Sequence, residues 1–208
     1  MSSVIEKKKR SKKLPKTITE SQALAILGGI NRKTISGCRH YAIIMTMYRD
    51  GLRVSEICNL TPADVNFETD MLFVQSGKGD KDRYVPMDPE AKEALQAWAE
   101  IRPESQYFFC AYSKGKSGKK LSTRQVRGMC YRTSDNAHVY IQDGTEQKKV
   151  SPHKFRHSAF TSMLDEGFNL REIQEIAGHS TIATTQIYTH ISMKGLANKF
   201  KQRGLLGA

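Results

Sequence analysis

Apolar residues recur at three- and four-residue spacing along most of the chain, and this spacing predicts a mainly helical protein. Capping signals mark where individual helices begin. Thr19 with Gln22 forms a capping box, and Ser122 with Gln125 repeats that pattern. Helices are predicted over residues 19–28, 34–49, 54–59, 88–101, 152–166, 169–177, 181–188 and 193–203, with a further one opening at residue 122.

The period changes to strand-like alternation between residues 65 and 86, where short apolar runs are separated by turn residues. Three strands are predicted there, over residues 65–67, 71–74 and 83–86. Asp143-Gly144 is a hairpin signal within residues 138–150. The expected fold class is therefore mainly α with a small three-stranded antiparallel β-sheet.

Residues 17–192 are predicted to form one domain, because no internal repeat and no change of composition divides them. Residues 1–16 hold a run of Lys and Arg with few apolar residues, which is typical of a flexible basic arm. The strongly apolar stretch at residues 41–48 is too short to span a bilayer, and no apolar segment follows the basic N-terminus. We therefore expect a cytoplasmic protein without membrane contact.

Charge is the first indication of function. The chain has 33 Lys and Arg against 21 Asp and Glu, a net charge of +12. Such a field favours polyanionic partners, nucleic acids above all. A basic protein whose charges are simply solvated would show the same balance, so charge alone does not decide.

The four cysteines are widely spaced, and none belongs to a C-x-x-C pair. This spacing implies neither zinc ligation nor a disulfide framework. We expect reduced, mostly buried cysteines, and neither a metal nor a cofactor.

His153 and Arg156 lie three residues apart at the start of a predicted helix, so they are neighbours on its first turn. The helix N-terminus favours an anion there. Arg can bind a phosphate through two hydrogen bonds, and His can donate one and transfer protons. A pair of surface residues without function would have the same spacing.

Three further residues could contribute chemistry. Tyr188 follows His179 by nine residues, and a phenol needs nearby cations to act as a nucleophile at neutral pH. Lys78 lies between two glycines in a predicted turn, where it could protonate a leaving oxygen. Arg53 opens a helix with Glu56 three residues on. A packing tyrosine, a solvated turn lysine and a surface ion pair are the ordinary alternatives.

In order, spacing and type, these residues resemble the tyrosine recombinase (phage integrase) family over roughly residues 17–195. The similar segments are Gly51-Leu52-Arg53-Val54-Ser55-Glu56-Ile57, Gly77-Lys78-Gly79-Asp80-Lys81-Asp82-Arg83-Tyr84-Val85-Pro86, His153-Lys154-Phe155-Arg156-His157-Ser158, Ala177-Gly178-His179-Ser180 and Thr184-Thr185-Gln186-Ile187-Tyr188-Thr189-His190. The resemblance implies the fold of that family's catalytic domain.

The resemblance also implies the residues' roles in cleaving and rejoining DNA. Tyr188 would attack a phosphate to give a 3′-phosphotyrosine, without metal or ATP. The remaining positions, whose roles the resemblance also supplies, are Arg53 and Arg156 (phosphate clamps), His179 (hydrogen-bond donor), His153 (acid–base catalysis), Lys78 (general acid), His157 and Glu56 (supporting), and Lys81 and Arg83 (contacts to backbone phosphate).

The implied partner is double-stranded DNA with specific recombination sites, bound by a homotetramer, with accessory DNA-bending proteins as further candidates. Residues 193–208 would form a C-terminal helix exchanged between subunits. Family members commonly carry another helical domain before the catalytic one, whereas about sixteen arm residues precede it here. Ala177 also replaces the family's usual leucine.

Integration, excision, inversion and resolution all fit this sequence, in a bacterial, archaeal or phage and mobile-element setting. Two other functions share some of its features. A type IB topoisomerase has the same residue set but rejoins the same strand. A non-catalytic basic DNA-binding protein would explain the charge but not the six matched polar positions.

Overall fold

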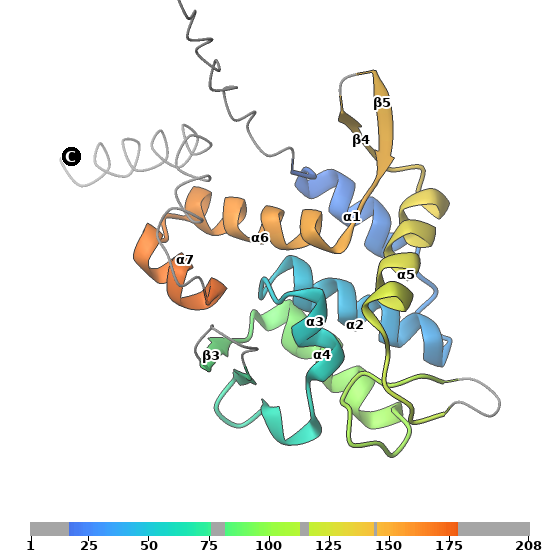
Figure 1. Cartoon of the computed structure of the whole chain (residues 1–208), viewed down its shortest axis with the longest axis vertical. Coiled ribbons are helices and arrows are strands. Elements are labelled where there is room, and N and C mark those ends of the chain that lie inside the picture. The colour runs from blue at the N-terminus through green and yellow to red at the C-terminus, as the bar shows by residue number, and fades with distance from the viewer. Residues whose placement is uncertain (1–16, 76–81, 113–116, 144, 179–208) are drawn as a thin grey trace, which may run out of the picture.

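The computed structural model describes residues 17–75, 82–112, 117–143 and 145–178, and Figure 1 shows the arrangement of its elements. Its α-helices are α1 (Glu20–Gly28), α2 (Ile35–Tyr48), α3 (Val54–Asn59), α4 (Pro89–Ile101), α5 (Thr123–Asn136), α6 (Pro152–Glu166) and α7 (Leu170–Ala177). A 3-10 turn, η1 (Pro62–Asp64), and the strands β1 (Val65–Asn66), β2 (Met71–Val74), β3 (Arg83–Pro86), β4 (Tyr140–Asp143) and β5 (Glu146–Lys149) complete the set.

Local capping signals place the helix starts where the sequence predicts them. The hydroxyl of Thr19 accepts the Gln22 backbone N–H, and the Gln22 side chain accepts the Thr19 N–H. Ser122 and Gln125 make the same reciprocal pair at α5. Each box satisfies donors that the first helical turn leaves open. The helices predicted at 181–188 and 193–203, the basic arm at 1–16 and the C-terminal tail lie outside the described residues.

The predicted three-stranded antiparallel sheet is confirmed, in the order β1-β2-β3. Val74 of β2 pairs with Arg83, the first residue of β3, and the connection that contains Lys78 lies outside the described residues. Strands β4 and β5 form a separate antiparallel hairpin around residue 144, as the Asp-Gly signal indicates. It projects beside the start of α6 (Figure 1).

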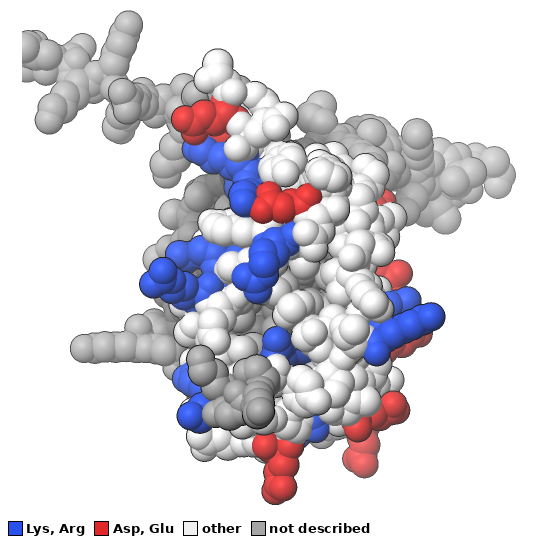
Figure 2. Space-filling view, turned by 90° about the vertical axis from the view of Figure 1, so that its right-hand side faces the viewer, with Lys and Arg blue, Asp and Glu red and all other residues white. Residues whose placement is uncertain are grey.

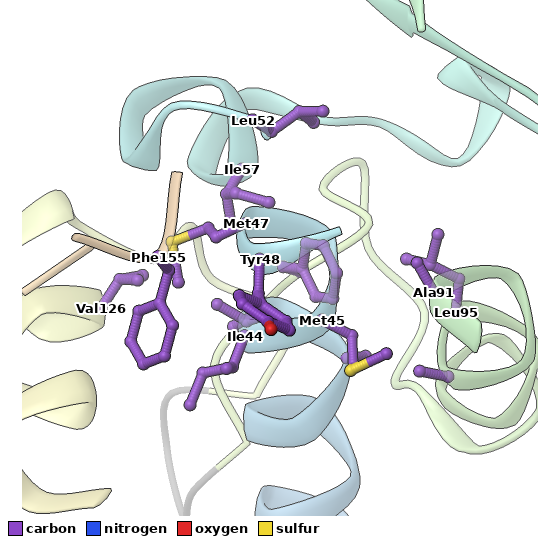
Figure 3. Close-up of a cluster of buried hydrophobic side chains, with 14 of the residues drawn as sticks. Ile44, Met45, Met47, Tyr48, Leu52, Ile57, Ala91, Leu95, Val126 and Phe155 are labelled. Atoms are coloured by element: carbon purple, nitrogen blue, oxygen red, sulfur yellow. The ribbon is translucent and has the colours of Figure 1, made fainter. Parts of the chain in front are cut away.

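Helix α2 is the centre of the hydrophobic core and packs against α4 on one side and α6 on another. Its buried Ile44, Met45 and Met47 meet side chains from the surrounding helices and from the turn after α2 (Figure 3). Those neighbours are Leu52, Ile57, Ala91, Leu95, Val126 and Phe155. The core thus fixes the end of α2, after which the chain turns into the segment that carries Arg53. The four cysteines are buried, as expected.

A smaller apolar cluster holds α7 against α6. Phe160 and Leu164 of α6 bury their side chains with Ile173 and Ala177 of α7. The faces that meet follow the spacing of three and four residues expected for packed helices. This cluster sets the position of the last turn of α7 relative to α6.

Asp50, at the end of α2, is a buried carboxyl with an incomplete set of partners. Its side chain is 1% exposed. One oxygen, Oδ1, accepts the backbone N–H of Asp88 at 2.8 Å, whereas Oδ2 has no hydrogen-bond partner among the described residues. Burial raises the pKa of Asp50 well above its ordinary value; the hydrogen bond from Asp88 opposes this shift and the Asp88 carboxylate adds to it.

The raised pKa predicts that Asp50 destabilises the fold as pH rises. Below about pH 4 both folded and unfolded chains carry the protonated acid, and the penalty is absent. Above it the unfolded chain ionises first, so stability falls by up to about 1.4 kcal/mol per pH unit until the folded pKa is reached. The uncharged isostere in Asp50→Asn should therefore gain stability over the wild type between pH 5 and pH 8. Urea unfolding across that range measures the difference, and a constant difference would contradict the assignment.

None of the helices in the described part of the chain combines the length and the apolar composition needed to cross a bilayer.

Candidate active site

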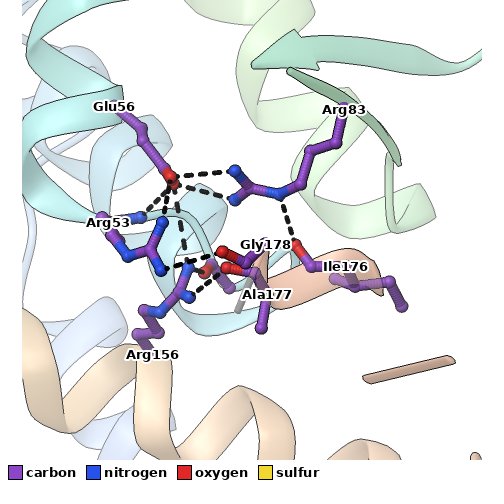
Figure 4. Close-up of polar contacts among 8 residues, drawn as sticks. Arg53, Glu56, Arg83, Arg156, Ile176, Ala177 and Gly178 are labelled. Carbon is purple, nitrogen blue, oxygen red and sulfur yellow. Dashed lines mark hydrogen bonds and ion pairs between the residues drawn. The ribbon is translucent and has the colours of Figure 1, made fainter. Parts of the chain in front are cut away.

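Three arginines from three separate elements converge on the carboxylate of Glu56 in α3 (Figure 4). Arg53 donates Nη1–H to Oε1 at 3.0 Å. Arg83 of β3 makes a bidentate pair, with Nη1 to Oε1 at 2.9 Å and Nη2 to Oε2 at 3.0 Å. Arg156 of α6 places Nη1 3.7 Å from Oε2. Residues that are 103 positions apart in the chain are thereby gathered around one acid.

The turn between α2 and α3 positions Arg53. Gly51 has a φ of +70°, and a Cβ there would lie 2.7 Å from the ring of Phe160, so only glycine fits. Arg53 is the N-cap of α3, and its backbone N–H donates to Glu56 Oε2 at 2.7 Å. The Gly-Leu-Arg-Val-Ser-Glu segment is thus a helix start. In it, the Glu56 carboxylate accepts the backbone N–H of Arg53, and the Arg53 side chain extends into the cluster.

Arg156 is held from several sides. Its side chain is 6% exposed, and its Nη1–H donates to the Gly51 carbonyl. Nη2–H donates to the Ala177 carbonyl at 2.7 Å, and the guanidinium lies 4.7 Å from the ring centroid of Phe160. These contacts connect α6 to the Gly51 turn and to the end of α7.

The C-terminal end of α7 presents three successive carbonyls to the arginines; we call residues 176–178 the carbonyl ledge. Ile176 accepts from Arg83 Nε at 2.7 Å, Ala177 from Arg156, and Gly178 from Arg53 Nη2 at 3.3 Å. Cations are favourable at this end of a helix, where carbonyls lack helical partners. Gly178 has a φ of +62° and lies against Arg83.

The four side chains of the cluster carry a net charge of +2, from three guanidinium groups and one carboxylate. Burial works against the ionised form of Glu56, but the hydrogen bonds and charge of Arg83, followed by the charge of Arg156, outweigh it and lower the pKa of Glu56. Glu56 is therefore a carboxylate at neutral pH. The surplus positive charge makes the cluster suited to an additional anion.

His153 lies on the first turn of α6 and is exposed, one turn before Arg156. Partial burial and the charges of Arg127, Arg156 and Arg53 lower its pKa, so it is neutral at pH 7 and able to accept a proton. His157 is half-buried; burial, Lys154, His153 and Arg156 lower its pKa to about 4. The effect of Arg127 on the pKa of His153 could not be predicted from the sequence, because Arg127 belongs to α5 and comes near His153 only in the folded protein.

The structure brings together five of the residues singled out from the sequence: Arg53, Glu56, Arg156, His153 and, unexpectedly, Arg83. His157, also singled out, is half-buried on the same helix as His153 and Arg156, whereas Lys78, Lys81, His179 and Tyr188 lie outside the described residues. His179 follows Gly178 directly, so the chain leaves the carbonyl ledge into the segment that carries Tyr188.

A second concentration of positive charge lies between α2 and α5. A cleft of about 500 Å³ is lined by Arg39, Arg124 and Arg132, together with Tyr112. Figure 2 shows Lys and Arg side chains gathered in the middle of one face of the molecule, and several Asp and Glu at its lower edge. Within the ranges that the structure describes, no group of three or more His, Cys, Asp or Glu is arranged to hold a metal ion.

Comparison with known proteins agrees with this arrangement. Residues 16–194 match the model of the phage integrase family. Tyrosine recombinase XerC of Corynebacterium efficiens is 38% identical over 195 residues, 93% of this chain and 60% of that protein. Tyrosine recombinase XerA of Pyrococcus furiosus is 35% identical and covers 94% of this chain and 64% of its own length. The chain thus spans about 60–64% of the length of these relatives.

Solved structures show the same fold. A crystal structure of XerA recombinase superposes with a TM-score of 0.74 at 33% identity, over 91% of this chain and 65% of that one. The Tn1549 transposon integrase in complex with a circular intermediate DNA gives a TM-score of 0.69 at 24% identity, over 90% of this chain and 65% of that one, and shows the fold alone. These matches confirm the expected mainly helical catalytic-domain fold, and the chain belongs to the phage integrase family.

Proposed function

We propose that residues 17–192 are the catalytic part of a site-specific DNA recombinase that acts in the cytoplasm. The observation that carries this proposal is the cluster of Arg53 and Arg156 around Glu56. It has a surplus of positive charge and lies against the end of the helix from which the chain continues to His179 and Tyr188. The Arg156 side chain is only 6% exposed, whereas the arginine of an ordinary surface ion pair is largely exposed to solvent.

In the proposed reaction, the Tyr188 phenol oxygen attacks the scissile phosphorus and the P–O5′ bond breaks. Arg53 and Arg156 stabilise the charge that develops on the non-bridging oxygens, and His179 adds a hydrogen bond. His153, neutral at pH 7, accepts the phenol proton, and Lys78 protonates the leaving 5′-oxygen. A 5′-hydroxyl of another strand reverses these steps and releases Tyr188.

The proposed substrate is double-stranded DNA that carries specific sites. Strand exchange between two duplexes uses four nucleophiles, so the proposed active species is a homotetramer on DNA, with accessory DNA-bending proteins as candidate partners. The basic cleft between α2 and α5 supports a polyanionic substrate. Arg39, Arg124 and Arg132 line that cleft, and contacts from such side chains to phosphate supply affinity rather than sequence readout.

The proposal is tested by trapping the covalent intermediate. Protein purified under denaturing conditions from the source cells should carry DNA, and sequencing its ends gives the site. The substrate is a duplex with that site and a nick close to the scissile phosphate. Cleavage then releases a short fragment that carries the 5′-hydroxyl, and because this fragment diffuses away, the protein adduct on the 3′ phosphate should accumulate. The adduct should form equally well in EDTA, because arginines supply the positive charge.

Two outcomes would contradict the proposal. Adduct formation that EDTA abolishes and Mg²⁺ restores would indicate metal-ion phosphoryl transfer. A protein that relaxes supercoiled DNA but never exchanges strands between two copies of the site would be a topoisomerase instead.

A further inference from the structure

Arg83 connects three elements that are distant in the sequence. It begins β3, and its guanidinium reaches Glu56 in α3 through two hydrogen bonds and Ile176 in α7 through a third. Every nitrogen of the guanidinium is used: Nε, Nη1 and Nη2 each donate to protein oxygen at 2.7–3.0 Å. A planar guanidinium fork suits a bidentate carboxylate pair, which an ammonium group cannot reproduce.

Arg83 is also enclosed. Its side chain is 8% exposed, against 26% for Arg53. Gly178 closes one side of it, because a Cβ at that position would lie 2.8 Å from Arg83 Nη1 and 3.1 Å from Cδ. Three of its five N–H groups already donate to protein oxygens, and the low exposure of the side chain leaves little access for a phosphate at the other two. The expectation that Arg83 contacts backbone phosphate therefore conflicts with its surroundings.

We propose that Arg83 is a positioning residue of the active site and does not contact DNA. This inference rests on the proposed recombinase function. Arg83 fixes the Glu56 carboxylate, which in turn orients Arg53, and it fixes the carbonyl ledge of α7, which sets the start of the segment leading to His179. Substitution of Arg83 should therefore slow the cleavage of DNA that is already bound to the protein. The affinity for DNA should stay unchanged.

The test separates cleavage from binding in Arg83→Lys. On saturating amounts of the nicked substrate, the rate of adduct formation should fall about 10- to 100-fold, because a lysine keeps the charge but loses the fork. The dissociation constant on the site and on random-sequence duplex should stay within about twofold of the wild type. The slope of log K against log salt should also stay unchanged, whereas a lost phosphate contact would flatten it by about 0.9.

Arg102→Lys is the matched control. Arg102 is another part-buried arginine, and it donates to the carbonyls of Ser105, Tyr107 and Phe108 at the end of α4. Its substitution removes comparable hydrogen bonds at a place without contact to Glu56 or the carbonyl ledge. It should lower thermal stability without slowing cleavage at temperatures where the protein is folded. Hydrogen exchange at residues 176–178 should accelerate in Arg83→Lys and not in the control.

Weaker binding with a flattened salt slope and a normal rate at saturation would overturn the proposal, and so would wild-type behaviour in every assay. If Arg83→Lys does not fold, the wild type decides through phenylglyoxal modification. Arg83 should resist the reagent with and without DNA, whereas modification that DNA blocks would make it a phosphate contact. A wild type that forms no adduct would contradict the proposed function instead. The hydrogen-exchange and modification data would still show whether Arg83 holds Glu56 and the carbonyl ledge.

Discussion

Tyr188→Phe is expected to abolish the covalent protein–DNA adduct while the protein still binds its site. The substitution removes one oxygen atom, the proposed nucleophile, and leaves the arginine cluster and the ring intact. Loss of a nucleophile lowers a rate by about 10⁴-fold or more in enzymes whose catalytic groups act as a unit. Denaturing gel electrophoresis of the nicked-substrate reaction measures the adduct, and a gel-shift titration measures binding.

Tyr84→Phe is the matched control for this experiment. Tyr84 is 68% exposed and lies beside Arg83 on β3, so it is an accessible phenol close to the site. Its substitution should leave adduct formation within about twofold of the wild type. An adduct that persists in Tyr188→Phe and disappears in Tyr84→Phe would show that Tyr84, and not Tyr188, is the nucleophile.

Glu56→Ala is expected to lower the free energy of unfolding by about 3–5 kcal/mol, the usual cost of removing one partner from a buried ion pair. Three arginines would lose their shared carboxylate, and the buried guanidinium groups of Arg83 and Arg156 would repel each other. Cleavage should fall with stability, because Arg53 loses both the acceptor of its side chain and the cap of its backbone N–H. Urea unfolding measures the change.

Glu56→Gln separates charge from hydrogen bonding, because the amide oxygen can still accept the Arg53 backbone N–H. The lowered pKa of Glu56 means that its contribution is complete above the unfolded pKa, near about 4.3, and is lost as pH falls through the folded value. The stability of the wild type should therefore fall toward that of Glu56→Gln as the pH drops below about 4.3. An unfolding midpoint that is the same in all three proteins at pH 7 would show that Glu56 does not hold the cluster.

Much of this fold follows from signals that are local in the sequence. The capping boxes at Thr19 and Ser122 and the change from helical to alternating spacing at residue 65 each depend on a few neighbouring residues. Such signals act before any tertiary contact forms, so these helix starts and the three-stranded antiparallel sheet could be predicted. The part of the site that lies within one turn, Arg53 with Glu56 and His153 with Arg156, was found for the same reason.

The role of Arg83 could not be predicted, because it depends on a contact between residues 83 and 176. From the sequence, a basic residue after a turn in a basic protein fits a phosphate contact. Only the packing of α7 on α6 brings the Ile176 carbonyl and Gly178 against β3. The carbonyl ledge was missed because backbone groups leave no residue-type signal, although Gly178, a glycine directly after a predicted helix, indicates a left-handed cap.

The most direct test of the proposed function is to identify the residue that carries DNA in the trapped adduct. Nuclease digestion of the adduct followed by tryptic mass spectrometry should find a nucleotide 3′-phosphate on the peptide that contains Tyr188, and on no other. A nucleotide attached to a serine, to a different tyrosine, or through a 5′ phosphate would contradict the proposed mechanism.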